Sequence, residues 1–432
     1  MQNKVILLTL LCLFSVTVVK AQMDNLSNMS SKWIASPARY AATDEADIVN
    51  YNPAGVVHLS DGFHLNLSNQ TLIRKPKHTF NLGAGDQTYG QDGIDPFLPN
   101  MYMAYKKNKW AVSSGLYISG GGATVNYPEG SINITLLGYK LLNGINAASG
   151  AKYQALSDQH LKASSYYLTI PLQFAYAVND QWSFAVGGRC ILGINSTSAG
   201  VTIGKSALGA PDTPIGVDYK ENATGFGGVI GVFYQPTNKL GLSLHYESKV
   251  KLDFEAKDNA GSYTLIPDGS KNRRDLPATL CGGVSYKLTD RLTGAADFSY
   301  CFQKNADWGT ITYNGVTSEA SDAAGNSYTA GIGFTCDATE KLQFSAGCKY
   351  TRFMYDNQEL YYTKLGMYEV VKYNNIFTGV GAAYKINKKL QVELAGGRTT
   401  WKDSKVKSLN AGIPVSIQDV GYVIAVGVDI TI

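Results

Sequence analysis

Side chains that could carry out chemistry are few in this 432-residue chain, and their spacing gives little support to catalysis. The five histidines, at positions 58, 64, 78, 160 and 245, do not have metal-ligand spacing. Ser243 and His245 fall on one face of a predicted strand and could serve a lipase-like hydrolysis, but one such pair is expected by chance. No glycine-rich phosphate loop occurs in a strand–turn–helix setting. The sequence therefore favours neither an enzyme nor a bound metal or cofactor.

Six cysteines are present, and the five that follow the first twenty-one residues are Cys190, Cys281, Cys301, Cys336 and Cys348. An odd number without metal or disulfide spacing indicates neither a zinc site nor a disulfide framework. Each lies in a strand-like segment, which favours a packing role as a small, half-buried apolar residue.

The N-terminus has the features of a secretory signal peptide. Lys4 precedes an apolar run that extends to Val19, and small residues follow around Ala21. The run is shorter than the ~20 residues that span a membrane, so a cleaved signal over residues 1–21 is favoured over an anchor. We therefore expect the rest of the chain to be exported.

The composition excludes two further classes of protein. The 38 Lys and Arg residues are nearly balanced by 34 Asp and Glu residues without a basic block, which argues against a nucleic-acid binder. A mean hydropathy of −0.11 is too low for a polytopic helical membrane protein. Charged residues make up only 17% of the chain, below the ~25% typical of soluble domains.

Side chains alternate in character along most of the chain from Asp61 onward. Large apolar residues occupy every second position from Tyr422 to Ile432, and mostly small or polar residues lie between them. Successive side chains of a strand point to opposite faces, so such a strand has one apolar and one small or polar face. A membrane β-barrel requires this arrangement, although a soluble sandwich would show a similar alternation.

Fourteen strands are predicted, and the lengths of their connections distinguish a membrane β-barrel from a soluble sandwich. The predicted strands are 61–74, 100–107, 109–124, 163–178, 181–199, 219–235, 239–256, 275–288, 291–304, 325–337, 341–356, 370–386, 389–402 and 416–432. Tight turns such as Thr289-Asp290 follow the even-numbered strands, and long loops such as 75–99 follow odd-numbered ones. Outer-membrane barrels sort their connections in this way, with the short turns on the periplasmic side. We therefore predict an all-β fold, a fourteen-stranded antiparallel transmembrane β-barrel over residues 61–432.

Tyrosine is abundant, with 28 residues, as expected for aromatic belts at the two membrane–water interfaces. Aromatic residues near the predicted strand ends are Tyr102, Tyr105, Trp110, Tyr176, Trp182, Tyr286, Tyr384 and Trp401. Tyrosine favours any strand, so the belts support the barrel without deciding it.

Residues 22–60 do not alternate and indicate short helical or irregular pieces at 29–34, 37–42 and 44–56. A barrel of fourteen strands has a lumen too wide for its own side chains to fill, and this segment could plug it as a small hatch. Asn52 can cap a helix and Pro53 suits the first helical position, so Asn52-Pro53-Ala54 predicts a turn or a helix start.

The stretch Glu45-Ala-Asp-Ile-Val-Asn-Tyr-Asn-Pro-Ala-Gly55 resembles the hatch signature of the FadL/TodX family, outer-membrane transporters of long-chain fatty acids and other hydrophobic compounds. Further similarities follow in order along the barrel, at Leu98–Met101, Gly225–Gly227, Leu244–Phe254, Leu276–Ala278 and Asp297–Tyr300. The resemblance covers most of residues 40–305.

The resemblance implies that the hatch, with Asn52, Pro53 and Ala54, gates the lumen. A hydrophobic ligand would be captured outside and enter a pocket above the hatch. In the family the extreme N-terminus reaches this pocket, which would here involve Met23 and Leu26.

The family also releases its ligand sideways, through an inward kink of the third strand. By position, this kink corresponds to Ser119, Gly120, Gly121 and Gly122. Glycine in a strand permits a bend or bulge, although the same residues could be a flexible strand end that enters the next loop.

That next loop contains a run of apolar residues that could form a capture groove for lipid-like ligands or a small core on the barrel rim. The residues are Ile132, Ile134, Leu136, Leu137, Tyr139, Leu141, Leu142 and Ile145.

Passive uptake of long-chain fatty acids or similar hydrophobic molecules is therefore the leading hypothesis. A general diffusion porin, or a structural or adhesive barrel, is the alternative, and an enzyme comes third. The expected partners are the hydrophobic ligand, outer-membrane lipid and lipopolysaccharide, with the protein as a monomer. A TonB-dependent receptor is excluded because twenty-two strands and a plug do not fit this length.

Overall fold

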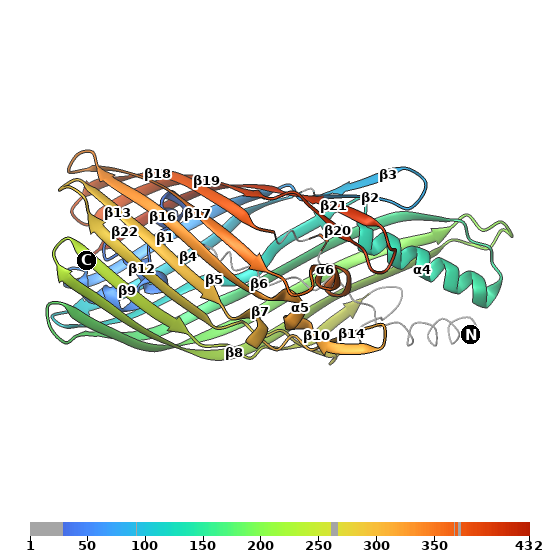
Figure 1. Ribbon diagram of the computed structural model, residues 1–432, viewed down its shortest axis with the longest axis horizontal. Coiled ribbons are helices and arrows are strands. Elements are labelled where there is room, and N and C mark those ends of the chain that lie inside the picture. The colour runs from blue at the N-terminus through green and yellow to red at the C-terminus, as the bar shows by residue number, and fades with distance from the viewer. Residues whose placement is uncertain (1–28, 92, 261–266, 367, 370–372) are drawn as a thin grey trace.

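The protein forms a closed, antiparallel β-barrel of fourteen strands (Figure 1), as the alternation predicts. The computed structural model describes residues 29–91, 93–260, 267–366, 368–369 and 373–432, so the predicted signal peptide, Met23 and Leu26 lie outside the described residues. The barrel strands are β1 (Gly62–Arg74), β4 (Ile94–Lys107), β5 (Trp110–Tyr127), β6 (Ala155–Ala177), β7 (Trp182–Gly204), β8 (Thr213–Thr237), β9 (Leu240–Glu247), β12 (Thr279–Lys287), β13 (Leu292–Cys301), β16 (Asn326–Asp337), β17 (Leu342–Met354), β18 (Asn375–Asn387), β19 (Leu390–Trp401) and β22 (Val420–Thr431).

The first and last barrel strands close the cylinder. β1 pairs with β22 from His64 opposite Thr431 to Arg74 opposite Gly421. The chain ends at Ile432, whose amide donates to the carbonyl of Phe63 over 2.8 Å. The last strand therefore closes the barrel.

Large apolar side chains cover the outside of the barrel wall, and small or polar ones face the lumen. Leu394 is 60% exposed on β19, whereas its neighbours Glu393 and Ala395 are buried on the lumen side. Tyr105, Tyr176, Trp182, Tyr286 and Tyr384 are exposed near the tight turns, as expected for an interface belt. Tyr102 and Trp401 are buried instead and do not belong to such a belt.

Within the described residues, no helix is both long enough and apolar enough to span a membrane.

Three strands, β6 to β8, extend well beyond the others on the long-loop side (Figure 1). The residues around 200–218, expected as a long loop, instead continue the β7–β8 hairpin as far as Ile203 opposite Thr213. The apolar loop after β5 forms the helix α4 (Ile132–Ser149), which packs against this extension. Ile132, Ile134, Leu141 and Leu142 are buried there, so much of the apolar run forms a loop core.

Further short elements from the long loops cover the outer end of the lumen. They are β2 (Lys77–Asn81), β3 (Asp86–Gly90), β10 (Asp253–Ala260), β11 (Lys271–Arg273), η2 (Gln303–Asn305), β14 (Thr310–Tyr313), β15 (Val316–Glu319), α5 (Ala320–Ala324), α6 (Gln358–Leu365), β20 (Ser404–Lys407) and β21 (Pro414–Gln418). Side chains of these elements and of the loops beside them, including Trp308, Tyr361 and Tyr362, form one buried cluster with Tyr167 of β6 and Ile191 of β7. We call this cluster the outer cap.

The segment 29–60 lies inside the barrel near the tight turns and forms the described part of the hatch. It contains α2 (Ser31–Ala35), α3 (Ile48–Tyr51) and the 3₁₀-helix η1 (Pro53–His58). The stretch 37–42, expected as a helical or irregular piece, has no helix and carries a turn around Tyr40. Pro37 leaves one backbone donor fewer for a helix there.

Glycines on the lumen face of the wall allow the hatch backbone to approach closely. A Cβ atom at Gly379 of β18 would overlap the carbonyl oxygen of Ile34, and one at Gly381 would lie 2.6 Å from the Cβ of Ala35. No side chain larger than hydrogen fits between the wall and α2 at these positions.

We predict that Gly379→Ala displaces α2 from the wall and destabilises hatch docking by about 1–3 kcal/mol, because the added methyl group meets backbone rather than a flexible side chain. Gly396→Ala is the matched control on the neighbouring strand, since its Cβ would meet its nearest atom at 3.7 Å. Hydrogen exchange of the α2 amides should increase in the first variant only. Equal exchange in the two variants would contradict the close approach.

Candidate functional site

Asn52 holds the hatch turn together by two hydrogen bonds. Its Oδ1 accepts from the amide of Gly55 over 3.1 Å and caps η1, and its Nδ2 donates to the carbonyl of Ala42 over 2.9 Å. Pro53 follows at the first position of η1, which suits its fixed backbone angle. Asn52 is 1% exposed, so in this structure its side chain braces the hatch rather than facing a ligand.

The other residues of this string contact the barrel wall. Ser183 of β7 donates to the carbonyl of Ala54 over 2.7 Å. A Cβ at Gly231 of β8 would lie 3.2 Å from Pro53 Cγ, so this glycine leaves room for the proline ring. Asn52, Pro53 and Ala54 therefore fix the hatch both internally and against β7 and β8.

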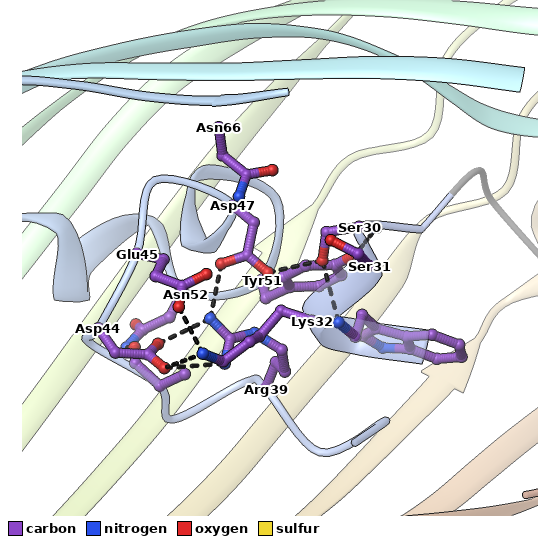
Figure 2. A network of polar contacts seen from close by, with 12 residues as sticks. Ser30, Ser31, Lys32, Arg39, Asp44, Glu45, Asp47, Tyr51, Asn52 and Asn66 are labelled. Carbon is purple, nitrogen blue, oxygen red and sulfur yellow. Dashed lines mark hydrogen bonds and ion pairs between the residues drawn. The ribbon is translucent and has the colours of Figure 1, made fainter. Parts of the chain in front are cut away.

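A buried polar network joins the hatch to β19 of the wall, and Figure 2 shows the part of this network that lies within the hatch. Lys32 of α2 forms an ion pair with Glu45, and Gln391 of β19 donates to Glu45 Oε1 over 2.7 Å. The hydroxyl of Ser31 hydrogen-bonds to Glu393 of β19. Removing one partner of such a buried pair costs roughly 3–5 kcal/mol, because the remaining charge is left uncompensated.

A second part of the network lies within the hatch. Arg39 contacts Asp47 over 2.6 Å and Asp44 over 2.7 Å, and the Ser30 hydroxyl donates to Asp47 over 2.6 Å. Burial raises the pKa of Asp47 to about 6, although the charge of Arg39 opposes this shift. Burial is the largest influence on Glu45 and opposes its ionisation, but the charges of Lys32 and Arg39 and the hydrogen bond with Glu393 together outweigh it and lower the pKa of Glu45. No local pattern in the sequence indicates that Gln391 and Glu393 complete this network.

A cavity of about 130 Å³ lies between the hatch and the outer cap. Hatch residues Trp33, Tyr40 and Tyr51 form one side, and polar residues of the wall form much of the rest. The wall residues include Arg189, His245, Glu247, Asp297, Ser327 and Lys349.

The charged groups at the cavity have partners in the protein. Arg189 forms an ion pair with Glu247 and donates to the carbonyl of Ser248 over 2.9 Å. The Nζ of Lys349 lies 4.3 Å from the centre of the Trp33 ring, a cation–π contact between wall and hatch. The cavity is thus lined by aromatic rings and by charged groups that contact other parts of the protein.

Ser119 of β5 also lines this cavity, next to an irregularity in the barrel wall. From Ile118 to Ala123, β5 advances by five residues while β6 advances by three, from Leu168 to Ser165. Gly121 within this bulge has a φ of 103°, and a Cβ there would overlap the carbonyl oxygen of Ser165. Glycine is therefore required at this position of the wall.

Above the same point, β5 is no longer paired with β4. The ladder between β4 and β5 runs from Lys107 opposite Trp110 to Met101 opposite Leu116 and stops there, although both strands continue. Two residues without an amide hydrogen, Pro96 and Pro99, lie in the part of β4 beyond the ladder. We call this unpaired stretch of wall, between 94–100 and 117–127, the β4–β5 seam.

The pair Ser243 and His245 does not form a catalytic arrangement. The Ser243 hydroxyl donates to the carbonyl of Tyr40 and so seats the hatch, and the His245 ring packs edge-on against Tyr40 with centroids 5.3 Å apart. Among the described residues, no cluster of histidine, cysteine and acidic side chains could hold a metal ion. The five cysteines after the predicted signal, all within the described residues, form no disulfide, and Cys281 and Cys301 are buried in the wall.

The chain belongs to the family described as outer membrane protein transport protein (OMPP1/FadL/TodX), because the sequence model of this family matches residues 11–431. It is therefore an outer-membrane β-barrel of a family of hydrophobic-substrate transport channels rather than enzymes. No curated protein matches the sequence.

Solved structures with a similar fold include a Pseudomonas aeruginosa FadL homologue, with a TM-score of 0.69 and 14% identity over 95% of this chain and 100% of the other. The toluene transporter TodX of Pseudomonas putida has a TM-score of 0.65 and 15% identity, over 95% of this chain and 99% of TodX. The toluene transporter TbuX of Ralstonia pickettii has a TM-score of 0.58 and 17% identity, over 93% of this chain and 98% of TbuX. At these identities the likeness shows the fold.

We predict that Asn52→Ala loosens η1 by about 1–2 kcal/mol, because both the cap and the bond to Ala42 are lost. Asn52→Asp keeps the acceptor for Gly55 but places a buried carboxylate oxygen against the carbonyl of Ala42, so it should loosen η1 at least as much as Asn52→Ala. Hydrogen exchange of the η1 amides measures the effect. Unchanged exchange in Asn52→Ala would show that the side chain does not hold the turn.

Acid should also loosen the hatch. The pKa of Glu45 is lower in the folded protein than the ~4.3 of a free glutamate. The ion pair of Glu45 with Lys32 therefore stabilises the hatch fully above the pKa of the free glutamate. This stabilisation is lost as the pH falls through the lower pKa of the folded protein. We expect faster exchange of the α2 amides below about pH 4 in the wild type. Glu45→Gln should show faster exchange already at pH 7 and a flatter response to acid, and an equally steep response would contradict this role.

Proposed function

We propose that the protein takes up small hydrophobic molecules through the cavity above the hatch and releases them sideways through the β4–β5 seam. The observation that carries this proposal is the position of Ser119, which lines the cavity and lies at the bulge where β5 loses its pairing with β4. Lateral release suits an apolar ligand, because entering the bilayer removes its surface from water, at ~0.8 kcal/mol per CH₂ group.

The size of the cavity favours a single-ring aromatic ligand over a long chain. Its volume of about 130 Å³ is close to the ~150 Å³ of a protein cavity that accommodates benzene, and below the ~300 Å³ at which drug-sized ligands begin to fit. A toluene-sized molecule could therefore enter with little rearrangement. A long-chain fatty acid, the second candidate, is favoured by the polar lining around Lys349, but it would require the hatch or the outer cap to move.

The filled lumen argues against a general diffusion porin. The hatch occupies the end near the tight turns, and the outer cap buries Trp308, Tyr361 and Tyr362 at the other end. A porin holds an open, polar, water-filled channel. We infer that ligand-dependent movement of the hatch, braced by Asn52, Pro53 and Ala54, controls access to the seam.

We predict that deleting Gly121 and Gly122 abolishes uptake, because it removes the two extra residues of β5 and allows a continuous ladder with β6. The control deletes Gly83 and Ala84, two exposed residues of the β2–β3 turn. Uptake of radiolabelled toluene and of oleate would be measured in cells that express each variant. Heat-modifiable migration shows whether the variant without Gly121 and Gly122 is a folded barrel. If this folded variant still transported either compound at the wild-type rate, lateral release would be overturned.

Planar-bilayer recordings separate this function from a porin. The wild-type protein should show no steady ion conductance, since both ends of the lumen are filled. A large, constantly open conductance would favour the porin instead.

A further inference from the structure

One side of the barrel carries a cluster of exposed cations immediately above its apolar band. We call this cluster the basic collar, and it comprises Lys75, Lys77, Arg398, Lys402, Lys405 and Lys407. The residues lie on adjoining strands, because β19 pairs with β22 and β22 with β1, and their outer extensions β20, β21 and β2 pair in the same order (Figure 1).

The boundary between the apolar band and the collar falls at one rung of the sheet. Arg398 lies opposite Tyr422, and Tyr422 lies opposite Ile73. The Arg398 guanidinium carbon lies 5.8 Å from the centre of the Tyr422 ring. Below this rung the outer face is apolar, with Leu394, Ile424, Val426 and Leu67 exposed. A tyrosine with a cation over it is typical of a membrane–water interface.

Above this rung the exposed face becomes cationic and polar. Lys77 lies opposite Gln418, and Lys405 lies opposite Ser416. The other face of the same small sheet is buried, and its residues Val406 and Ile417 belong to the outer cap. The lysines therefore point away from the protein core. Asp403 is the exposed acid nearest to them along the chain, and it accepts a hydrogen bond from Gln418 over 3.1 Å.

The wall on the far side of the barrel does not share this excess of positive charge. On the extension of β6 to β8, the exposed cations Lys162 and Lys220 are accompanied by the exposed acids Asp158 and Asp218. The positive charge is therefore a property of one sector and not a uniform feature of the outer rim.

We propose that the basic collar binds the phosphate groups of the phosphorylated glycolipid in the outer leaflet, while its acyl chains lie on the apolar band below. A single amphiphile fits both halves of this surface, because its anionic groups lie directly above its hydrocarbon. A soluble anion would use the lysines but would have no reason to be centred on the apolar boundary at Tyr422. Positive side chains near a membrane surface are drawn to anionic headgroups in this way.

The test uses the purified full-length protein in a neutral detergent, titrated with bisphosphorylated lipid A and with the same lipid after removal of its phosphates. Bound lipid is counted by native mass spectrometry. The test variant combines Arg398→Gln, Lys402→Gln, Lys405→Gln and Lys407→Gln. The control combines Lys341→Gln, Lys385→Gln, Lys388→Gln and Lys389→Gln, which removes the same number of exposed charges from the tight-turn end of the same wall. Heat-modifiable migration confirms that each barrel is folded.

The wild type and the control should bind phosphorylated lipid A at least tenfold more tightly than the test variant does. The dephosphorylated lipid should not distinguish the three proteins. Unchanged affinity in the test variant would overturn the proposal, as would an equal loss in the control. Equally tight binding of a soluble polyanion, lost in the same variant, would also overturn it by assigning the surface to a soluble partner.

Discussion

The width of a fourteen-stranded barrel is the constraint on which the rest of this structure depends. Such a wall cannot fill its lumen with its own side chains, so other parts of the chain must close it. The hatch closes the end near the tight turns, and loop residues around Trp308 and Tyr361 close the outer end. Because the hatch packs inside the barrel, the inner face needs glycines such as Gly379 where the two backbones approach closely. The polar side chains that become buried there need partners, as in the ion pair Lys32–Glu45.

Closure at both ends leaves the side wall as the route that the geometry supports. The cavity between hatch and cap reaches Ser119, where β5 takes two more residues than β6 and parts from β4. Gly121 and the prolines of β4 both interrupt the regular pairing of the wall. Gly121 has a backbone angle that other residues avoid, and the prolines lack an amide hydrogen for the ladder. The wall is thus weakened at one of the places where the cavity meets it.

The sequence was sufficient to predict the barrel, because alternation and loop length depend on local patterns that each strand repeats. The turn at Asn52 and Pro53 was likewise predictable from the local conformational preferences of these two residues. The network around Gln391 and Glu393 could not be predicted, since these residues look like ordinary lumen-facing positions until the hatch is placed beside them. The contact of Ser243 with the hatch could not be predicted for the same reason, because its partner Tyr40 lies 203 residues away. The long β6–β8 extension was missed because its outer part carries no apolar outer face.

The central claim is that a hydrophobic ligand leaves through the β4–β5 seam rather than past the hatch. A photoactivatable, toluene-sized aryl diazirine, applied to outer membranes that contain the wild-type protein and mapped by mass spectrometry, tests it most directly. We expect adducts at Ser119 and at Leu98 on the β4 side of the seam, and none on the hatch near Ser60. Adducts along η1 and Ser60, with none at the seam, would contradict lateral release.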